Sequence, residues 1–414
     1  MHYKYESDII EKNISKLIGK DINMSGYFYK QPKYFDKFRC IGGACPETCC
    51  ADWAINWKKE EVEKLQNAEC SNDLRFKINY FFVPVDEKNY QIVLHPETKR
   101  CPFLNDENLC SIQKELGEEY LSMVCSNYPR NVTKCKNIFT RLCSSSCYAA
   151  LKLICDEEDS MDMVMKEVKV KNVESKVIYK KDYINHPELQ NLNEIFDFFY
   201  EILSAKDREI STSIVLGALA AKKISELAEN GKADVIPEAL NKLRPQMNNK
   251  AQIESINKME KNYIFSLGVV NEILNKLYGH DMFKVLRTDG KPDIDKCAAG
   301  MKRFNEAYKD KPYVLKNLIL NYFVDYFSFS YNSEKKTLYD HYLYFSFVVA
   351  AVNLSAAAVG YVCKDNEEIV KEFIEYQAAF ARKLANNIQS MNDTITYLKE
   401  HKWNTPAYIA LMVK

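Results

Sequence analysis

Four cysteines fall within eleven residues in the stretch FRCIGGACPETCCADW, which runs from Phe38 to Trp53. These cysteines are Cys40, Cys45, Cys49 and Cys50. Gly42 and Gly43 lie between the first two and permit a tight turn. Because thiolates are soft, charged ligands, such a group favours zinc or an iron–sulfur centre. The stretch therefore predicts a region of the fold that is organised around a metal.

More cysteines follow this stretch along the chain. Cys101, Cys110, Cys125 and Cys147 bring the number of candidate ligands to eight. Eight thiols would satisfy two four-coordinate sites, or one iron–sulfur cluster with several supporting residues. The common C-x2-C spacings are absent, and Asp52 occupies the third position of a possible C-x3-C-x2-C pattern. We therefore expect the ligands to come from four segments that the fold brings together.

The other cysteines are expected to play a different part. Free cysteine is often a small buried hydrophobic residue, and an isolated cysteine favours that interpretation. The isolated ones are Cys70, Cys135, Cys155, Cys297 and Cys363. Cys143 stays ambiguous, because it forms a helical spacing with Cys147.

Composition limits the class of protein. Lys+Arg and Asp+Glu both number 57, so the net charge is zero, and nucleic acid is not expected as the main partner. The chain has 12 glycines and no G-x-G-x-x-G or G-x-x-x-x-G-K-[ST] pattern, which disfavours the usual nucleotide cradles. The stretch from Met1 to Asp21 is charged throughout and lacks the apolar segment of a secretory signal. A cytoplasmic location is therefore expected, where thiols stay reduced.

The distribution of cysteines predicts the domain organisation. Twelve of the fourteen lie between Cys40 and Cys155. We predict a mainly α fold in which an N-terminal cysteine-rich, cluster-binding domain precedes an all-α helical domain. The expected parts are an N-terminal extension at 1–30, the cysteine-cluster domain at 31–156, a charged connector at 157–188 and the helical domain at 189–414. Within the connector, a solvated helix or a strand is expected near Met163 to Val170.

Helical periodicity dominates the second half. Apolar residues recur every three or four positions from Leu189 to Leu203. A helix is expected to start at Ile214, capped by Ser211 to Ser213, and to stop at Asn230-Gly231. Pro237 suits the first turn of the next helix. Further helices are predicted at 253–277, 313–329, 342–362 and 367–387.

One of these segments has the length of a membrane span. No charged residue occurs from Tyr342 to Cys363. The segment nevertheless contains Asn353, several serines and tyrosines, and the small residues Ala356 to Ala358, which suit close packing between helices. We interpret it as a buried central helix and expect no membrane association.

The ordered cysteine blocks resemble a known family. The block from Phe38 to Trp53 is followed by Cys-Pro-Phe-Leu104, Leu-Cys-Ser-Ile112, Glu-Leu-Gly117 and Cys-Ser-Asn-Tyr-Pro-Arg130. This set looks like the flagellin lysine N-methylase family, within the wider group of YkgJ-type cysteine-cluster proteins. The resemblance covers residues 25 to 155 most strongly, and the helical remainder agrees in length and character.

The resemblance implies methyl transfer from S-adenosylmethionine to lysine side chains of flagellin, with a cysteine-bound iron–sulfur cluster of the 4Fe–4S type; zinc is the alternative metal. It implies the ligand set Cys40, Cys45, Cys49, Cys50, Cys101, Cys110, Cys125 and Cys147. A looser echo runs from Phe380 through Arg382 to Asn386, where the family is associated with histidine. Asn386 therefore departs from the pattern.

Other site residues are candidates by position. Tyr128 and Arg130 flank a cysteine and are candidate contacts for the methyl donor, although they could instead shape the ligand loop and offset thiolate charge. Glu47 and Asp52 are candidate bases, with solvated surface carboxylates as the other interpretation. His95 is the histidine nearest the cysteine blocks and the one to test as a ligand.

Two functions of other classes stay open. One is a zinc-binding or iron–sulfur-binding module without enzymatic activity, whose helical domain serves as a docking surface. The other is a redox sensor whose thiols alternate between metal-bound and disulfide states. Binding of the methyl donor distinguishes the enzyme from both.

Overall fold

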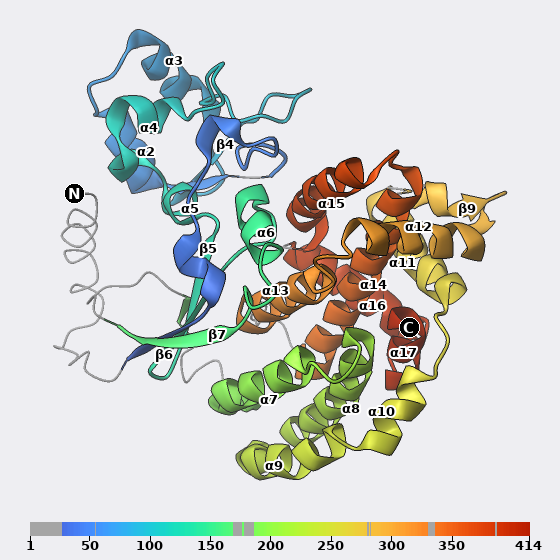
Figure 1. The fold of residues 1–414 in the computed structure, drawn as a ribbon. Helices are drawn as coiled ribbons and strands as arrows, with labels where there is room; N and C mark the ends of the chain where they lie inside the picture. The colour runs from blue at the N-terminus through green and yellow to red at the C-terminus, as the bar shows by residue number, and fades with distance from the viewer. Residues whose placement is uncertain are drawn as a thin grey trace.

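A computed structural model describes residues 27–53, 55–168, 176–177, 186–279, 281, 283–329, 336–385 and 387–414. Most of the predicted N-terminal extension and part of the predicted connector lie outside these residues. Helices make up most of the described chain, which confirms the mainly α prediction. Figure 1 shows a small lobe at one end, a twisted sheet beside it, and a large helical bundle.

The central sheet joins the lobe to the bundle. Its five strands have the order β7-β1-β6-β5-β8, and β1 runs parallel to β6 but antiparallel to β7. The strands are β1 (Phe28–Pro32), β5 (Arg130–Cys135), β6 (Ile138–Cys143), β7 (Met163–Glu167) and β8 (Lys176–Val177). Strand β7 agrees with the strand expected near Met163. The cysteine spacing predicted no sheet, because spacing carries no information on strand pairing.

The small lobe, residues 50–127, has a core of its own. A three-stranded sheet in the order β2-β4-β3 packs with short helices around the buried Trp57, Leu65 and Phe103. Its elements are β2 (Asn56–Lys58), α2 (Lys59–Gln66), α3 (Asn72–Phe81), β3 (Phe82–Pro84), β4 (Asn89–Ile92), α4 (Ser111–Leu116), η3 (Glu118–Tyr120) and α5 (Met123–Asn127). The loop before the lobe contains η1 (Lys33–Lys37) and η2 (Gly42–Ala44).

The helical bundle follows the sheet. Its elements, after α6 (Tyr148–Ile154), are η5 (Pro187–Asn191), α7 (Leu192–Ser204), α8 (Ile210–Glu229), η6 (Ala233–Val235), α9 (Ile236–Met247), α10 (Lys250–Asn257), α11 (Tyr263–Tyr278), η7 (Lys284–Leu286), β9 (Arg287–Thr288), β10 (Lys291–Pro292), α12 (Ile294–Ala307), α13 (Val314–Phe329), α14 (Leu338–Val362), α15 (Asn366–Phe380), the π-helical turn η8 (Ala381–Ala385), α16 (Ile388–Glu400) and α17 (Pro406–Val413).

Helix α14 is the centre of this bundle and contacts α8, α12, α13, α15 and α17. It is long and apolar enough to cross a membrane by length and composition, yet 83% of its most apolar window is buried inside the protein. Thr337 caps its N-terminus, with Asp340 completing a capping box. The predicted buried central helix is confirmed.

Most other helix predictions are confirmed, with three corrections. Helix α8 begins at Ile210 rather than at Ile214, because Ser211 to Ser213 are buried within the helix and do not cap it. The helix predicted at 253–277 is two helices, since Asn262 caps a new one. The helix predicted at 367–387 changes to π-helical turns at Ala381.

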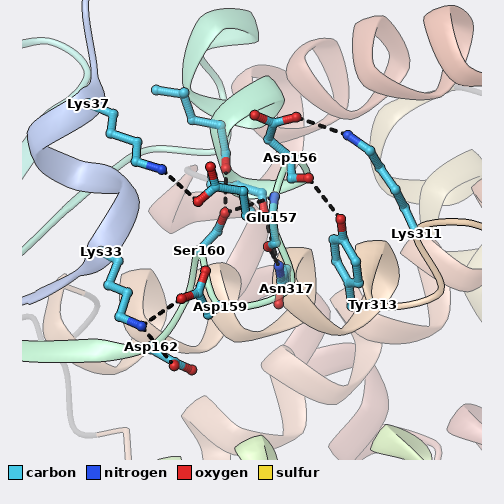
Figure 2. A network of polar contacts seen from close by, with 12 residues as sticks. Lys33, Lys37, Asp156, Glu157, Asp159, Ser160, Asp162, Lys311, Tyr313 and Asn317 are labelled. Carbon is cyan, nitrogen blue, oxygen red and sulfur yellow. Dashed lines mark hydrogen bonds and ion pairs between the residues drawn. The ribbon is translucent and has the colours of Figure 1, made fainter.

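The main core crosses from the sheet into the bundle. Residues on both sides of position 156, such as Leu142, Ala150, Phe199 and Leu318, belong to one buried cluster. The acidic turn at 156–162 links the two parts on the surface, as Figure 2 shows: Lys33, Lys37 and Lys311 reach its carboxylates, while Tyr313 and Asn317 donate to its backbone carbonyls.

Candidate functional site

The cysteine loop at residues 40–50 lies against the loop at 105–109. Gly42 has a φ of +56°, in the left-handed region that favours glycine. A Cβ at Gly43 would lie 2.2 Å from the carbonyl oxygen of Glu107, so only glycine fits this approach. The two glycines that the sequence singled out therefore let the first cysteine block approach the Cys110 segment.

Backbone pairing brings further cysteines to the same place. The Cys101 amide donates to the Cys50 carbonyl over 2.7 Å, and Leu104 pairs with Cys110 in a β-bridge. Cys125 lies in α5, where its amide donates to the capping Ser122 hydroxyl over 3.1 Å. Cys147 immediately precedes α6. The structure thus brings together segments that are up to about a hundred positions apart in the chain.

The thiols lie close enough to affect one another electrostatically. Burial, together with neighbouring thiolates, raises the pKa of Cys101 and of Cys147 to about 12 and that of Cys125 to about 11. A hydrogen bond with the Cys50 thiol lowers the pKa of Cys49 below its usual value, with a smaller contribution from the charge of Arg382. These buried thiols would release protons on binding a metal.

The donor set fits a thiophilic centre in chemistry, although its coordination geometry is not formed. Within the described ranges, no group of three or more His, Cys, Asp or Glu side chains is placed to hold a metal ion. Cys40 is exposed, and its Sγ accepts from the Gly42 amide over 3.4 Å. The ligand assignment of the eight cysteines therefore stays a prediction.

Arg382 reaches this loop from the helical bundle. Its side chain is 3% exposed, its Nη1 donates to the Thr48 carbonyl over 2.5 Å, and its Nη2 pairs with the Glu47 carboxylate. Glu47, a candidate base, is thus held in an ion pair. Asn386, where the family resemblance breaks down, lies outside the described residues.

Tyr128 and Arg130 take different places beside the cysteines. Tyr128 is largely buried, its hydroxyl lies 3.1 Å from Ser146 Oγ, and its ring centroid is 5.2 Å from that of Trp53. Burial raises its pKa well above the usual value, and the charge of Cys147 adds to this. Arg130 is exposed, with its guanidinium carbon 5.0 Å from the centroid of Phe38.

His95 and Asp52 serve local turns. The Nδ1 of His95 accepts from the amides of Glu97 and Thr98, which fixes the loop before Cys101. Asp52 is exposed and has a φ of +67°.

A polar seam, formed by Tyr34, Asn131, Ser145, Asn321 and Asp325, lies buried between the sheet and α13. Asn321 donates to the Cys143 carbonyl over 3.1 Å and to Ser145 Oγ over 2.9 Å, and Tyr34 donates to Asn321 Oδ1 over 2.7 Å. Sequence analysis missed this seam. The available signal was a pair of polar residues, four positions apart, in the otherwise apolar run from Leu318 to Phe327.

Asp325 is the charged member of the seam. One carboxylate oxygen accepts from Asn131 over 3.2 Å, and the other has no hydrogen-bond partner among the described residues. Burial raises its pKa to about 7, against a contribution from Asn131 that lowers it. A carboxyl that titrates near neutral pH is a candidate for proton transfer.

The fold and the site together define a mainly helical protein with a thiol-lined junction between a small lobe and a bundle. The FliB lysine N-methylase C-terminal domain matches residues 196–412, which is more than half of the sequence, and the chain belongs to this family. No solved structure matches the chain.

Curated relatives agree with this membership. The chain is 27% identical over 140 residues to the Lysine-N-methylase of Salmonella typhimurium, which covers 33% of this chain and 35% of that protein. It is 29% identical over 133 residues to the flagellar biosynthetic protein FliU of Salmonella muenchen, covering 32% of this chain and 79% of FliU. The match thus spans about a third of the length of the lysine methylase.

Proposed function

We propose that this protein transfers methyl groups from S-adenosylmethionine to lysine side chains of a protein substrate, flagellin, and that its cysteines hold a 4Fe–4S cluster. The observation that carries the proposal is the match of the helical bundle to the lysine N-methylase family. Relatives named Lysine-N-methylase and flagellar biosynthetic protein support the reaction and the substrate. The proposal includes a cytoplasmic location, where the free thiols stay reduced.

The proposed reaction needs a neutral amine. The lysine nitrogen attacks the methyl carbon of the sulfonium group, the C–S bond breaks, and its electron pair remains on sulfur as a neutral thioether. The ammonium proton must leave beforehand, so a proton acceptor is required. Aromatic faces and carboxylates are the groups that hold a cationic donor.

Asp325 is our candidate for this acceptor. Its pKa of about 7 lets it accept a proton near neutral pH, and one of its oxygens has no partner among the described residues. Asp325 is 6% exposed and accepts a hydrogen bond from Asn131 of β5, so a substrate would reach it only after this buried seam opens. Glu47 is less suited, because Arg382 already occupies its carboxylate.

The eight candidate cysteines are the residues that would hold the cluster. When bound, such a cluster supplies electron transfer and ties together the segments that ligate it. Tyr128 is half-buried beside the loop, where it contacts Trp53 and Ser146, and we expect it to orient that loop or contact the donor. Zinc is the alternative metal for the same thiols.

Two measurements test the proposal on the full chain purified without oxygen. Iron and sulfide in matching amounts, with the absorbance of a thiolate-bound cluster, are expected; stoichiometric zinc without colour would contradict the cluster. Incubation with flagellin and S-adenosylmethionine should add methyl masses to lysine residues. The Asp325→Asn variant should lower the rate by a factor of about 100 or more.

The controls separate the enzyme from the other functions. Glu188→Gln alters another buried carboxyl of the protein and should leave the rate within a few-fold. Absence of donor binding and of methyl transfer would favour a metal-binding module, and metal loss on oxidation with a change in partner binding would favour a redox sensor.

A further inference from the structure

Arg382 connects two parts of the protein that lie far apart in the sequence. It belongs to η8, at the end of α15, and contacts residues 47 and 48 of the cysteine loop. Glu47 and Thr48 immediately precede Cys49 and Cys50. A π-helical turn inside a helix is uncommon and is often found at functional sites. Here it carries the arginine that reaches the loop.

The guanidinium of Arg382 is not fully satisfied. Its Nη1 and Nη2 have partners, but its buried Nε has none among the described residues. A buried N–H without a partner costs roughly 1–3 kcal/mol, more when the group is charged. The same guanidinium is close enough to act electrostatically on Cys45 and Cys49. An acceptor at the thiol-lined junction would therefore stabilise the free N–H.

We propose that Arg382 is a positioning residue of the metal centre: it clamps the 45–50 loop through Thr48 and Glu47 and donates its Nε–H to a sulfur of the bound cluster. The inference rests on the iron–sulfur centre proposed above. It makes the helical bundle part of the site, because Arg382 belongs to η8 of that bundle.

Two consequences follow from the chemistry of the group. The clamp fixes a loop that carries neighbouring ligands, so its loss should speed the escape of iron. A hydrogen bond to sulfur and a nearby positive charge both favour the reduced, more negative form of a cluster, and they raise its reduction potential. A merely structural clamp would change the first property but not the second.

The experiment compares Arg382→Lys and Arg382→Gln with wild-type holoprotein prepared without oxygen. Lysine keeps the charge but lacks the planar fork and the Nε–H, whereas glutamine also loses the charge. Loss of iron to an excess of chelator should be at least tenfold faster in both variants. The reduction potential should fall in Arg382→Lys and fall further in Arg382→Gln. For Arg382→Gln we expect a fall of about 59 mV, which is a tenfold change in the equilibrium constant of a one-electron reduction.

Arg303→Lys is the matched control. Arg303 also joins separate elements, since its Nη2 donates from α12 to the carbonyls of Cys363 and Lys364 over 2.6 and 3.0 Å. That variant should keep the wild-type potential and rate of iron loss. Glu47→Gln retains Arg382 and should show faster iron loss without a fall in potential, because the Nε–H remains and a negative charge beside the cysteines is removed.

The outcomes separate the inference from the proposed function. Wild-type protein that holds no iron and sulfide would overturn both. Wild-type protein that holds the cluster, with both Arg382 variants matching it in iron loss and potential, would overturn the role of Arg382 alone. Circular dichroism of each variant shows whether the helical fold is intact, and Arg382→Lys keeps the test valid if the glutamine variant does not fold.

Discussion

The small lobe and the helical bundle stabilise themselves by different means. The core of the small lobe contains eleven buried residues among those described, and Trp57 and Phe103 are its largest fully buried side chains. The main core extends through the sheet and the helices and includes most of α14. Because a small core offsets little of the conformational entropy lost on folding, small units often rely on disulfides or metals.

The position of the thiols fits this difference. Cys50, Cys101, Cys110 and Cys125 all pack in or against the core of the small lobe. Cys297 and Cys363 lie instead in the main core, where helices already enclose them. A metal held by the first group would tie the lobe together, whereas the second group needs none. We therefore expect the bundle to be stable without metal and the lobe to depend on it.

The largest expected effect is the response of the lobe to loss of metal. Cys49→Ser, or removal of metal by a chelator, should strip the metal and unfold the small lobe, since metal binding and folding are linked. Proteolysis should then cut between residues 50 and 127, while most of the helical circular dichroism remains. Cleavage sites can be mapped by mass spectrometry.

Cys297→Ala is the control for this comparison. Cys297 is fully buried in α12, and its replacement should leave the metal content unchanged. Full metal content and unchanged melting in Cys49→Ser would refute the dependence of the lobe on metal. Loss of metal in Cys297→Ala would show that the helical bundle also contributes to metal binding.

Asp325 tests the seam that joins the two regions. Burial raises the pKa of this carboxyl from its ordinary value of 3.8 to about 7. Between about pH 4 and pH 7 this carboxyl ionises in the unfolded chain but stays protonated in the folded protein, so the folded protein loses stability as the pH rises. At about 1.4 kcal/mol per pKa unit, this loss approaches about 4 kcal/mol. Asp325→Asn should remove most of it, so the variant gains stability relative to wild type between pH 4 and pH 8.

Denaturant unfolding of both proteins at the two pH values measures this difference. Asp159→Asn is a control of opposite sign, because the ion pair with Lys33 lowers the pKa of this exposed carboxyl. Asp159→Asn should be slightly less stable than wild type, and only at pH values above the pKa of Asp159, where the carboxylate is ionised. A stability of Asp325→Asn that runs parallel to wild type across this range would exclude a titrating Asp325.

The two regions also differ in how far their sequences reveal them. Helices of the bundle follow from their periodicity and caps, as in α13 and α14, and the buried state of α14 follows from its small residues. The break between α10 and α11 escaped prediction because Ile253 to Leu277 keeps a helical pattern across it. In the cysteine-rich region, residue types indicate the chemistry of the site, but strand pairing decides which segments meet.

The polar seam and Arg382 show more clearly what a sequence pattern cannot predict. Asp325 and Arg382 gain their significance from residues that are 194 and 335 positions away, Asn131 and Glu47. No local pattern encodes such a contact. The predicted domain boundaries stay predictions. The cysteine ligand set also stays a prediction, because the described residues show cysteines near one another but no metal coordination.

The smallest expected effect tests whether the bundle owes its stability to close packing. Gly300 in α12 and Gly360 in α14 let two helices approach: a Cβ at Gly300 would lie 2.0 Å from the Ala357 carbonyl oxygen. Gly300→Ala should therefore destabilise the protein by about 1–3 kcal/mol through overpacking. In α11, a Cβ at Gly268 would meet nothing within 4 Å, so Gly268→Ala should stabilise it by about 0.5–1 kcal/mol. Thermal unfolding of both variants measures the contrast. Equal stabilisation by the two alanines would mean that α12 and α14 can move apart freely. Close packing between these helices would then not be a source of the stability of the bundle.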